Sequence, residues 1–352
     1  MNVVVFRTDR IGDLVLTLPV AEAIKRRHPS ARVTFVVQRY TRELALRAPH
    51  IDQVLDIPER DTDDVAALAG LLAPHAFTAA VFAYPRPGLA RAARRARIPM
   101  RIGSAYRWYA PLFTDRIREH RHDATRHESA YNIRLLAPLD VDVEHVPLPQ
   151  LRVSDEDARA AGEALRAAGI EEGRPFITMH PGSGGSAKDW SAARFGALAR
   201  MLLAHDPALA VLVTGTDAER ALMDVVRREA GDRAFLSAAD LQLPVLSAVL
   251  SKTSLFCSNS TGPLHIAAAH GVPSLGFYPF LTACHPRRWG PLGPHSRVLT
   301  PEPAADCEAC ARGRCPRHDD MSRISVERAV DAAQVLYAST QGREPAEASA
   351  GR

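Results

Sequence analysis

Two turns rich in small polar residues could bind the phosphates of a nucleotide. Residues 258–263 read SNSTGP and connect a short apolar run, expected to be a buried strand, to a helix that begins at Pro263. A turn between a strand end and a helix N-terminus presents free N–H groups and the positive end of the helix dipole. We therefore expect phosphate contacts from Ser260, Thr261 and Gly262, although an ordinary capped turn has the same residue types.

The second turn is the glycine-rich segment HPGSGGSAKDW at residues 180–190, which follows the apolar run 176–179. Backbone donors in a flexible loop, followed by a lysine, suit a diphosphate. We expect contacts from Ser183, Gly184 and Lys188. The spacing of a Walker A loop is absent. Two such strand ends in one domain suggest the two sides of a single nucleotide crevice.

A third candidate for chemistry is Asp13 in the segment RTDRIGD (residues 7–13), which follows the expected strand 3–6. A carboxylate at the edge of a sheet can act as a general base. It can equally be an acidic residue that stabilises the first turn of a helix. The segment has no G-x-G-x-x-G pattern, so it does not indicate a dinucleotide site.

The strand expected at 209–214 also ends in a polar turn, TGTDAE at residues 214–219. Asp217 or Glu219 could hydrogen-bond a ribose hydroxyl at this edge, and we favour Asp217. Acidic residues in a first helical turn have the same pattern.

An arginine-rich stretch separates the first group of strands from the middle of the chain. Residues 86–126 contain eleven arginines and three acidic residues, with aromatic residues among them. This excess predicts an anionic acceptor or an anionic membrane surface as the partner. Nucleic acid is the weaker alternative because no nucleic-acid-binding motif accompanies the stretch. We expect acceptor contacts from Arg94, Arg95, Arg97 and Arg101.

Four metal-ligand residue types lie close together near the C-terminus, in the order Cys307, Cys310, Cys315 and His318. Such a set could hold a structural zinc ion, but the spacing is tighter than in common zinc ribbons. Free thiols in a surface loop are the alternative.

The whole chain has the composition of a globular protein. It has 352 residues, 46% hydrophobic and 24% charged, with a net charge of +4. No apolar run approaches the length of a membrane span, and the chain enters directly into a strand without a signal segment. We therefore expect a cytoplasmic protein.

Apolar runs alternate with helical patterns along both halves of the chain. This alternation predicts an α/β fold with parallel sheets. The length suffices for two domains, expected at residues 1–150 and 151–322, followed by a helix at 323–338 and a disordered tail at 339–352.

Three segments together resemble glycosyltransferase family 9, the heptosyltransferases of lipopolysaccharide core synthesis and their relatives. They are RTDRIGDLVLTLP, HPGSGGSAKDW and SNSTGPLHIAAAHGVP, in the family's order. The resemblance implies a GT-B fold, in which two Rossmann-like parallel-sheet domains face each other across a cleft. The first domain would bind the acceptor and the second a nucleotide-sugar. The last helix would pack back on the first domain.

The resemblance also implies roles for single residues. Asp13 matches the family's proposed catalytic aspartate, and His265 matches a histidine of the donor site. Leu241 lies where the family has an apolar wall for the base. The family usually has Asp at the position of Ser260, which leaves the exact donor open.

The activity that the resemblance implies is metal-independent, inverting sugar transfer, with ADP-heptose as the first donor to consider. The acceptor would be an anionic cell-envelope glycan or glycolipid, with peripheral contact to the inner membrane. Two alternatives remain open at this point: a nucleotide-sugar epimerase on the same fold, and a non-catalytic nucleotide-sugar or glycan-binding module.

Overall fold

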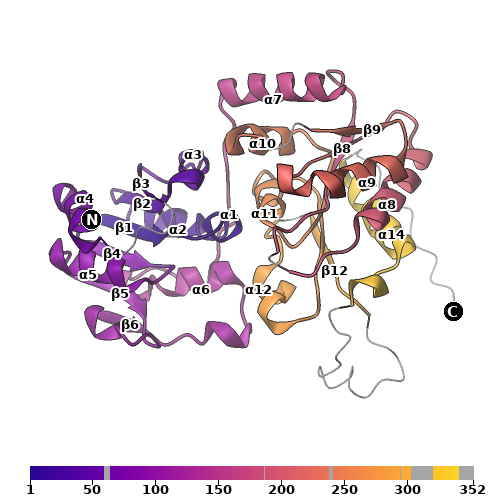
Figure 1. Ribbon diagram of the computed structural model, residues 1–352. Helices are drawn as coiled ribbons and strands as arrows, with labels where there is room; N and C mark the ends of the chain where they lie inside the picture. Colours follow the sequence, from indigo (N-terminus) through magenta and orange to yellow (C-terminus); the bar gives the residue numbers. More distant parts are fainter. Residues whose placement is uncertain (59–63, 186, 238–240, 294, 303–319, 341–352) are drawn as a thin grey trace, which may run out of the picture. The chain divides into compact units, whose positions relative to one another are not determined.

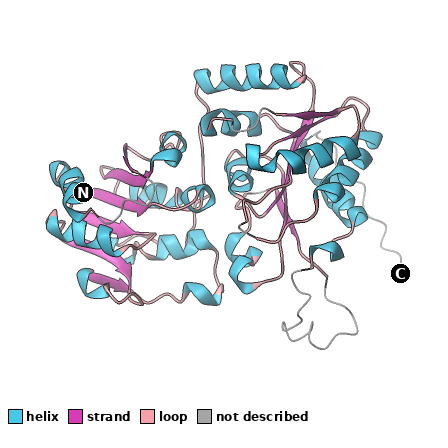
Figure 2. Cartoon of the chain, in the orientation of Figure 1, coloured by secondary structure: helices cyan, strands magenta, loops and turns pink. Residues whose placement is uncertain are grey.

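The computed structural model describes residues 1–58, 64–185, 187–237, 241–293, 295–302 and 320–340. The chain forms two compact units, Met1–Arg152 and Val153–Arg352. Within the described residues, each unit contains a parallel six-stranded sheet flanked by helices (Figures 1 and 2). The expected α/β class with two Rossmann-like sheets is therefore confirmed.

The first sheet has the strand order β3-β2-β1-β4-β5-β6, and all neighbouring strands are parallel. The central strand β1 is almost entirely apolar and its residues Val3–Phe6 are fully buried. Successive strands run outward from β1 on one side and from β4 on the other, so the order reverses between them. Ligands of open parallel sheets bind at the carboxyl ends of the strands beside such a reversal. The strands are β1 (Asn2–Arg7), β2 (Arg32–Gln38), β3 (Gln53–Ile57), β4 (Ala79–Phe82), β5 (Met100–Ser104) and β6 (Asp115–Ile117).

The helices of the first unit are mostly short. The segment that follows β1 forms two helices and not one, because Pro19 lacks an N–H group and begins a new helix. The arginine-rich stretch contains α5 (Pro87–Arg95), whose Leu89 and Ala92 are buried, and the strands β5 and β6, of which β5 buries Ile102. The helices are α1 (Ile11–Val15), α2 (Pro19–Arg27), α3 (Arg42–Ala45), α4 (Val65–Leu72), α5 (Pro87–Arg95) and α6 (Glu128–Arg134).

The second sheet has the order β12-β11-β10-β7-β8-β9, which repeats the topology of the first. The order reverses between β7 and β10, so the expected ligand edge lies where these two strands end. The strands are β7 (Phe176–His180), β8 (Ala210–Val213), β9 (Ala234–Leu236), β10 (Leu255–Asn259), β11 (Ser274–Phe277) and β12 (Ser296–Leu299).

Two apolar clusters cover the two faces of this sheet. Ile177 and Met179 of β7 pack with α8 (Ala192–His205), α9 (Arg220–Ala230) and α14 (Val326–Thr340). Phe176 packs with α7 (Asp155–Ala168) and α10 (Leu243–Leu250). This division follows from the alternation of side chains along a strand. Two further helices, α11 (Gly262–Ala269) and α12 (Pro286–Trp289), follow β10 and β11.

The expected packing of the C-terminal helix on the first domain stays a prediction. In the structure, Ala329, Ala333 and Leu336 of α14 belong to the core of the second unit. Its helical structure also extends to Thr340, so residues 339 and 340 are not part of a disordered tail. These apolar residues are spaced four and three positions apart, which gives one helix face that fits against α8 and the sheet.

Three other features bear on the expectations. Residues 341–352 of the expected tail lie outside the described residues, as do Cys307, Cys310, Cys315 and His318. The helix that follows Ser154 begins with a capping box between Ser154 and Asp157. No helix in the described part of the chain is long and apolar enough to cross a membrane.

Candidate active site

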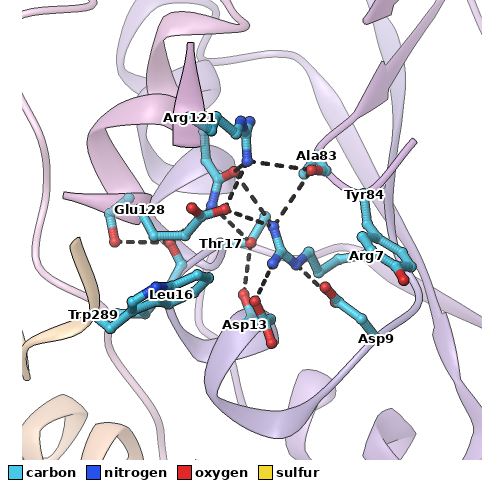
Figure 3. Close-up of polar contacts among 12 residues, drawn as sticks. Arg7, Asp9, Asp13, Leu16, Thr17, Ala83, Tyr84, Arg121, Glu128 and Trp289 are labelled. Carbon is cyan, nitrogen blue, oxygen red and sulfur yellow. Dashed lines mark hydrogen bonds and ion pairs between the residues drawn. The ribbon is translucent and has the colours of Figure 1, made fainter. Parts of the chain in front are cut away.

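A buried arginine organises the carboxyl end of β1 in the first unit (Figure 3). The Arg7 side chain is only 3% exposed. Its Nε donates to Asp9 Oδ1 at 2.8 Å, its Nη2 donates to Asp13 Oδ1, and its Nη1 donates to Glu128 Oε1 at 3.3 Å. One guanidinium therefore binds three carboxylates, which come from the turn between β1 and α1, from α1 itself and from the start of α6.

Helix α6 is fastened to the segment that carries Asp13. Ser129 Oγ donates to the carbonyl of Leu16 at 2.8 Å, and Asn132 Nδ2 donates to Thr17 Oγ1 at 3.0 Å. Thr17 Oγ1 in turn donates to the backbone carbonyl of Asp13 at 2.8 Å. These buried bonds fix the backbone of Asp13, while its carboxylate stays 18% exposed.

The electrostatics of this cluster are unusual. Burial alone would lower the pKa of Arg7, but the charges of Asp9, Asp13 and Glu128 outweigh it and raise that pKa above its usual value. Burial raises the pKa of Asp9 to about 7, although Arg7 acts in the opposite direction and the negative charge of Asp13 adds to the rise. A second guanidinium, from Arg121, donates to Glu128 Oε1 at 2.6 Å.

In the second unit, Asn259 fastens the glycine-rich loop to the end of β10. Its Nδ2 donates to the carbonyls of Pro181, at 2.6 Å, and Trp190, at 3.1 Å. Its Oδ1 accepts from the Trp190 backbone N–H at 2.8 Å. The buried Trp190 ring stacks on Phe277 with 4.2 Å between centroids. Both ends of the loop are thus fixed, while Gly184 and Gly185 between them are exposed and have positive φ.

Glu219, at the turn after β8, meets the same loop. Its carboxylate accepts from the Gly184 N–H at 3.3 Å and from the Thr216 N–H at 3.0 Å. A Cβ on Gly182 would lie 1.9 Å from Glu219 Oε1, so only glycine allows this approach. Burial opposes ionisation of Glu219, but the N–H of Thr216 and the neighbouring His180 outweigh it and lower the pKa.

The residues expected to bind the nucleotide-sugar follow the carboxyl ends of β7, β8, β9 and β10. Most lie on loops, and two lie in the first part of α11. Thr261 is the N-cap residue of α11, and its side chain makes no capping hydrogen bond. Ser183 is buried, and Lys188 is exposed. The helix begins at Gly262 and His265 is buried in it. The others are Gly184, exposed in its loop, Asp217, exposed beside Glu219, Leu241, half-buried before α10, and Ser260, hydrogen-bonded to Tyr278.

The arginines expected to bind the acceptor do not lie with Asp13. Helix α5 returns antiparallel to the strands, and Met100 at the start of β5 lies beside Thr78, just before β4. Because Arg94, Arg95, Arg97 and Arg101 belong to this return, they lie at the edge where the strands begin. Arg101 also donates to the carbonyls of Ile98, Pro99 and Leu112.

Other arginines follow the carboxyl ends of the strands, on the edge that carries Asp13. Arg86 comes after β4, Arg107 after β5 and Arg121 after β6. Arg86 donates to the Tyr84 hydroxyl and lies 4.6 Å from the Tyr84 ring centroid. Sequence reasoning missed this group because it used the density of arginines and not their positions relative to the strands.

Several central residues were not expected from the sequence. Arg7, Asp9 and Glu128 do not form a recognisable spacing, because Glu128 lies 121 positions from Arg7. Arg7 and Asn259 could have been found as polar residues at the ends of buried apolar strands, where burial requires partners. Asp217 and Glu219 were both candidates in the turn after β8, and Glu219 accepts a hydrogen bond from the glycine-rich loop.

Two parallel sheets of identical order, each with polar loops at the reversal of strand order, define a GT-B glycosyltransferase fold. The family model for glycosyltransferase family 9 (heptosyltransferase) matches residues 87–318, and the chain belongs to this family. It is therefore a heptosyltransferase-like glycosyltransferase.

Relatives and solved structures agree with this assignment. A Haemophilus influenzae protein assigned as a glycosyltransferase is 26% identical over 298 residues, which cover 83% of this chain and 86% of the relative. A family 9 glycosyltransferase from Veillonella parvula has a TM-score of 0.83 and 21% identity, with 96% and 97% coverage. The E. coli ADP-heptose lipopolysaccharide heptosyltransferase II has a TM-score of 0.78 and 18% identity, with 97% and 100% coverage.

One structural match bears on metals. The dodecameric glycosyltransferase TibC of E. coli is described as containing iron. Its structure has a TM-score of 0.58 and 16% identity to this chain, and the match covers 98% of this chain and 80% of the TibC chain. The expectation that catalysis needs no cofactor therefore stays a prediction for this chain.

Proposed function

We propose that the protein transfers a sugar, heptose first among the candidates, from a nucleotide-diphospho-sugar such as ADP-heptose to an anionic glycan or glycolipid, with inversion at the anomeric carbon. The observation that carries this proposal is the fixed carboxylate of Asp13 at the reversal of the first sheet. It is supported by the phosphate-type loops at the corresponding position of the second sheet. The ADP-heptose donor is taken from the name of the E. coli relative.

The second unit would bind the donor. Ser183, Gly184 and Lys188 would contact one phosphate group, and Ser260, Thr261 and Gly262 the other, at the start of α11. Asp217 or Glu219 would bind the ribose, Leu241 would contact the base, and His265 would support the phosphate turn. The N–H groups, the hydroxyls and the lysine at the two phosphate turns would stabilise the negative charge that grows on the departing diphosphate. A lysine and a helix N-terminus can do this without a metal ion, so we propose none for catalysis.

The first unit would bind the acceptor and activate it. Asp13 would take the proton from the acceptor hydroxyl while that oxygen forms a bond to the anomeric carbon. The bond from the same carbon to the diphosphate oxygen breaks on the opposite side, and the diphosphate keeps the electron pair. Arg7 holds the Asp13 carboxylate and orients it for this step.

The acceptor would be bound by the arginines on the same edge as Asp13. Arg86, Arg107 and Arg121 follow the ends of β4, β5 and β6, and a phosphate or carboxylate on the acceptor would pair with them. Exposed Trp108 lies beside this group, with Arg91 5.8 Å from its ring centroid. A surface of arginine and tryptophan also suits an anionic membrane, so we propose peripheral contact with the cytoplasmic face of the inner membrane and no role for nucleic acid.

The test is the substitution Asp13→Asn. The amide keeps an oxygen for Arg7 but cannot take a proton, and loss of a general base typically lowers turnover by about 10²–10⁴-fold. Donor affinity, measured by calorimetry with ADP, should stay nearly unchanged because the phosphate loops belong to the other unit. Asp52→Asn is the matched control. It breaks the Lys25–Asp52 pair of 2.6 Å at the edge where the strands begin, and should leave turnover intact.

The same assay separates the alternatives. An epimerase would consume the nucleotide-sugar without an acceptor. A binding module would bind ADP but would produce no transfer in the wild-type protein. Full transfer by a stably folded Asp13→Asn protein would refute the role of Asp13 as the base.

A further inference from the structure

The two aspartates at the end of β1 share one side of one guanidinium. Arg7 Nε and Nη2 point in the same direction in a planar guanidinium, and they donate to Asp9 and Asp13 respectively (Figure 3). A fork of this kind usually binds both oxygens of a single carboxylate. Here each prong binds a different carboxylate, which brings the two acids close together. Two carboxylates at such a short range cannot both ionise easily.

The cluster also has more carboxyl groups than cations. Among the described residues of the first unit, its ion pairs join the guanidiniums of Arg7 and Arg121 to the carboxyl groups of Asp9, Asp13 and Glu128. Glu128 accepts from both cations and is 1% exposed, so it is the best-neutralised acid. In the described part of the chain, Asp9 and Asp13 both pair with Arg7 alone, so the two carboxylates have one positive charge between them. A neutral cluster therefore requires one proton on this pair.

We propose that Asp9 is a positioning residue for the transfer reaction, which holds the surplus proton of the cluster and so keeps the neighbouring Asp13 carboxylate ionised on the Arg7 fork. This proposal rests on the proposed role of Asp13 as the base. Asp9 is the more enclosed of the two, with a side chain 13% exposed against 18% for Asp13. Its pKa of about 7 agrees with this division.

The arrangement has a consequence for pH dependence. Below neutral pH, Asp9 is protonated and Asp13 carries the single negative charge. When Asp9 loses its proton, two negatively charged carboxylates compete for one side of the Arg7 guanidinium, and the Asp13 carboxylate is held less firmly.

Within the described residues, the charged groups around Asp9 all belong to the same cluster. They are Arg7 of β1, Asp13 of α1, Glu128 of α6 and, through Glu128, Arg121. Two tyrosines also lie nearby. The Tyr40 hydroxyl donates to the Asp9 carbonyl at 3.0 Å, and the Tyr84 ring centroid lies 6.0 Å from Arg7 Cζ.

A titration without substrates tests the shared proton. The full-length protein, labelled with ¹³C at aspartate side-chain carboxyl groups, is followed by NMR from pH 4 to pH 9. We expect one carboxyl signal with a midpoint near 7, absent in Asp9→Asn and moved to lower pH in Asp13→Asn. Asp52→Asn should remove a different signal and leave that midpoint in place. If no aspartate titrates near neutral pH, or if Asp13→Asn leaves the midpoint unchanged, the shared proton is refuted.

Kinetics test the effect on catalysis separately. With ADP-heptose and a phosphorylated lipopolysaccharide core fragment, kcat/KM of the wild type should fall about three- to tenfold between pH 6 and pH 8, because Asp13 is positioned less well once Asp9 is ionised. Asp9→Asn should transfer at about the wild-type rate of pH 6 across this range and show no fall, because the neutral amide imitates the protonated acid. An unchanged pH profile in Asp9→Asn would overturn the positioning role. Loss of the base assignment itself would appear only in the Asp13→Asn assay, so the two failures are distinguishable.

Discussion

Replacement of Asn259 by alanine should detach the glycine-rich loop from the second sheet. The substitution removes three buried hydrogen bonds, two to the carbonyls of Pro181 and Trp190 and one from the Trp190 N–H. A buried polar group left without its partner costs about 1–3 kcal/mol. We therefore expect the second unit to lose about 3–5 kcal/mol of its free energy of unfolding, since water can satisfy part of the deficit.

The loop should lose its fixed position at the same time. Because both ends of the segment 181–190 depend on Asn259, its N–H groups would no longer be held in place for a diphosphate. We expect ADP affinity to fall at least about tenfold, which corresponds to about 1.4 kcal/mol. Urea unfolding followed by tryptophan fluorescence, and ADP titration by calorimetry, measure the two effects on one preparation.

Ser258→Ala is the matched control for this experiment. Ser258 precedes Asn259 on β10 and is also fully buried, but its hydroxyl donates to the Asn259 carbonyl, at 2.9 Å, and not to the loop. It should cost about 1 kcal/mol of stability and leave ADP affinity unchanged. The reasoning fails if the two substitutions weaken ADP binding equally, or if Asn259→Ala binds ADP like the wild type.

Three further predictions concern the same two sites. Lys188→Ala should weaken ADP binding by about 1.5–3 kcal/mol and leave adenosine binding nearly unchanged; equal losses for both ligands would show that Lys188 does not meet the phosphates. Gly182→Ala places a Cβ 1.9 Å from Glu219 Oε1 and should weaken ADP binding, and the double variant with Glu219→Ala should show a smaller loss than the two single losses added together. The pKa of Asp9 is raised from the ordinary aspartate value of 3.8 to about 7 in the native state. The native state therefore binds more protons between these values, and the free energy of unfolding falls as pH rises from about 4 to 7. That fall amounts to at most about 4 kcal/mol and should be missing in Asp9→Asn when melting temperatures are compared across this range; parallel curves for the two proteins would contradict it.

The local features of this protein follow from its sequence. The phosphate-type turns were recognisable because a buried strand, a small polar turn and a helix start are contiguous in the chain, as at Ser258–Pro263. The capping box at Ser154 and Asp157 is equally local. The alternation of strands and helices was sufficient for the α/β class, since parallel strands need helical connections. Asp13 lies in the segment that follows a buried strand and matches the proposed catalytic aspartate of the family.

The composition of each site depended on tertiary structure. Arg7 and Glu128 are 121 positions apart and meet only because α6 packs beside the end of β1. Asn259 and Trp190 come from separate segments that two adjacent strands, β7 and β10, bring together.

Chain direction, which composition does not contain, decided two further points. The arginine-rich stretch crosses the first sheet twice, so arginines that are neighbours in sequence lie at opposite edges of it. Arg86 follows β4 at the edge with Asp13, whereas Arg101 lies near the start of β5 at the other edge. Likewise, the apolar face of α14 was evident from residue spacing, but only packing decided that it covers the second sheet. A sequence gives the type and local geometry of a side chain, and the fold decides which distant groups share its charge.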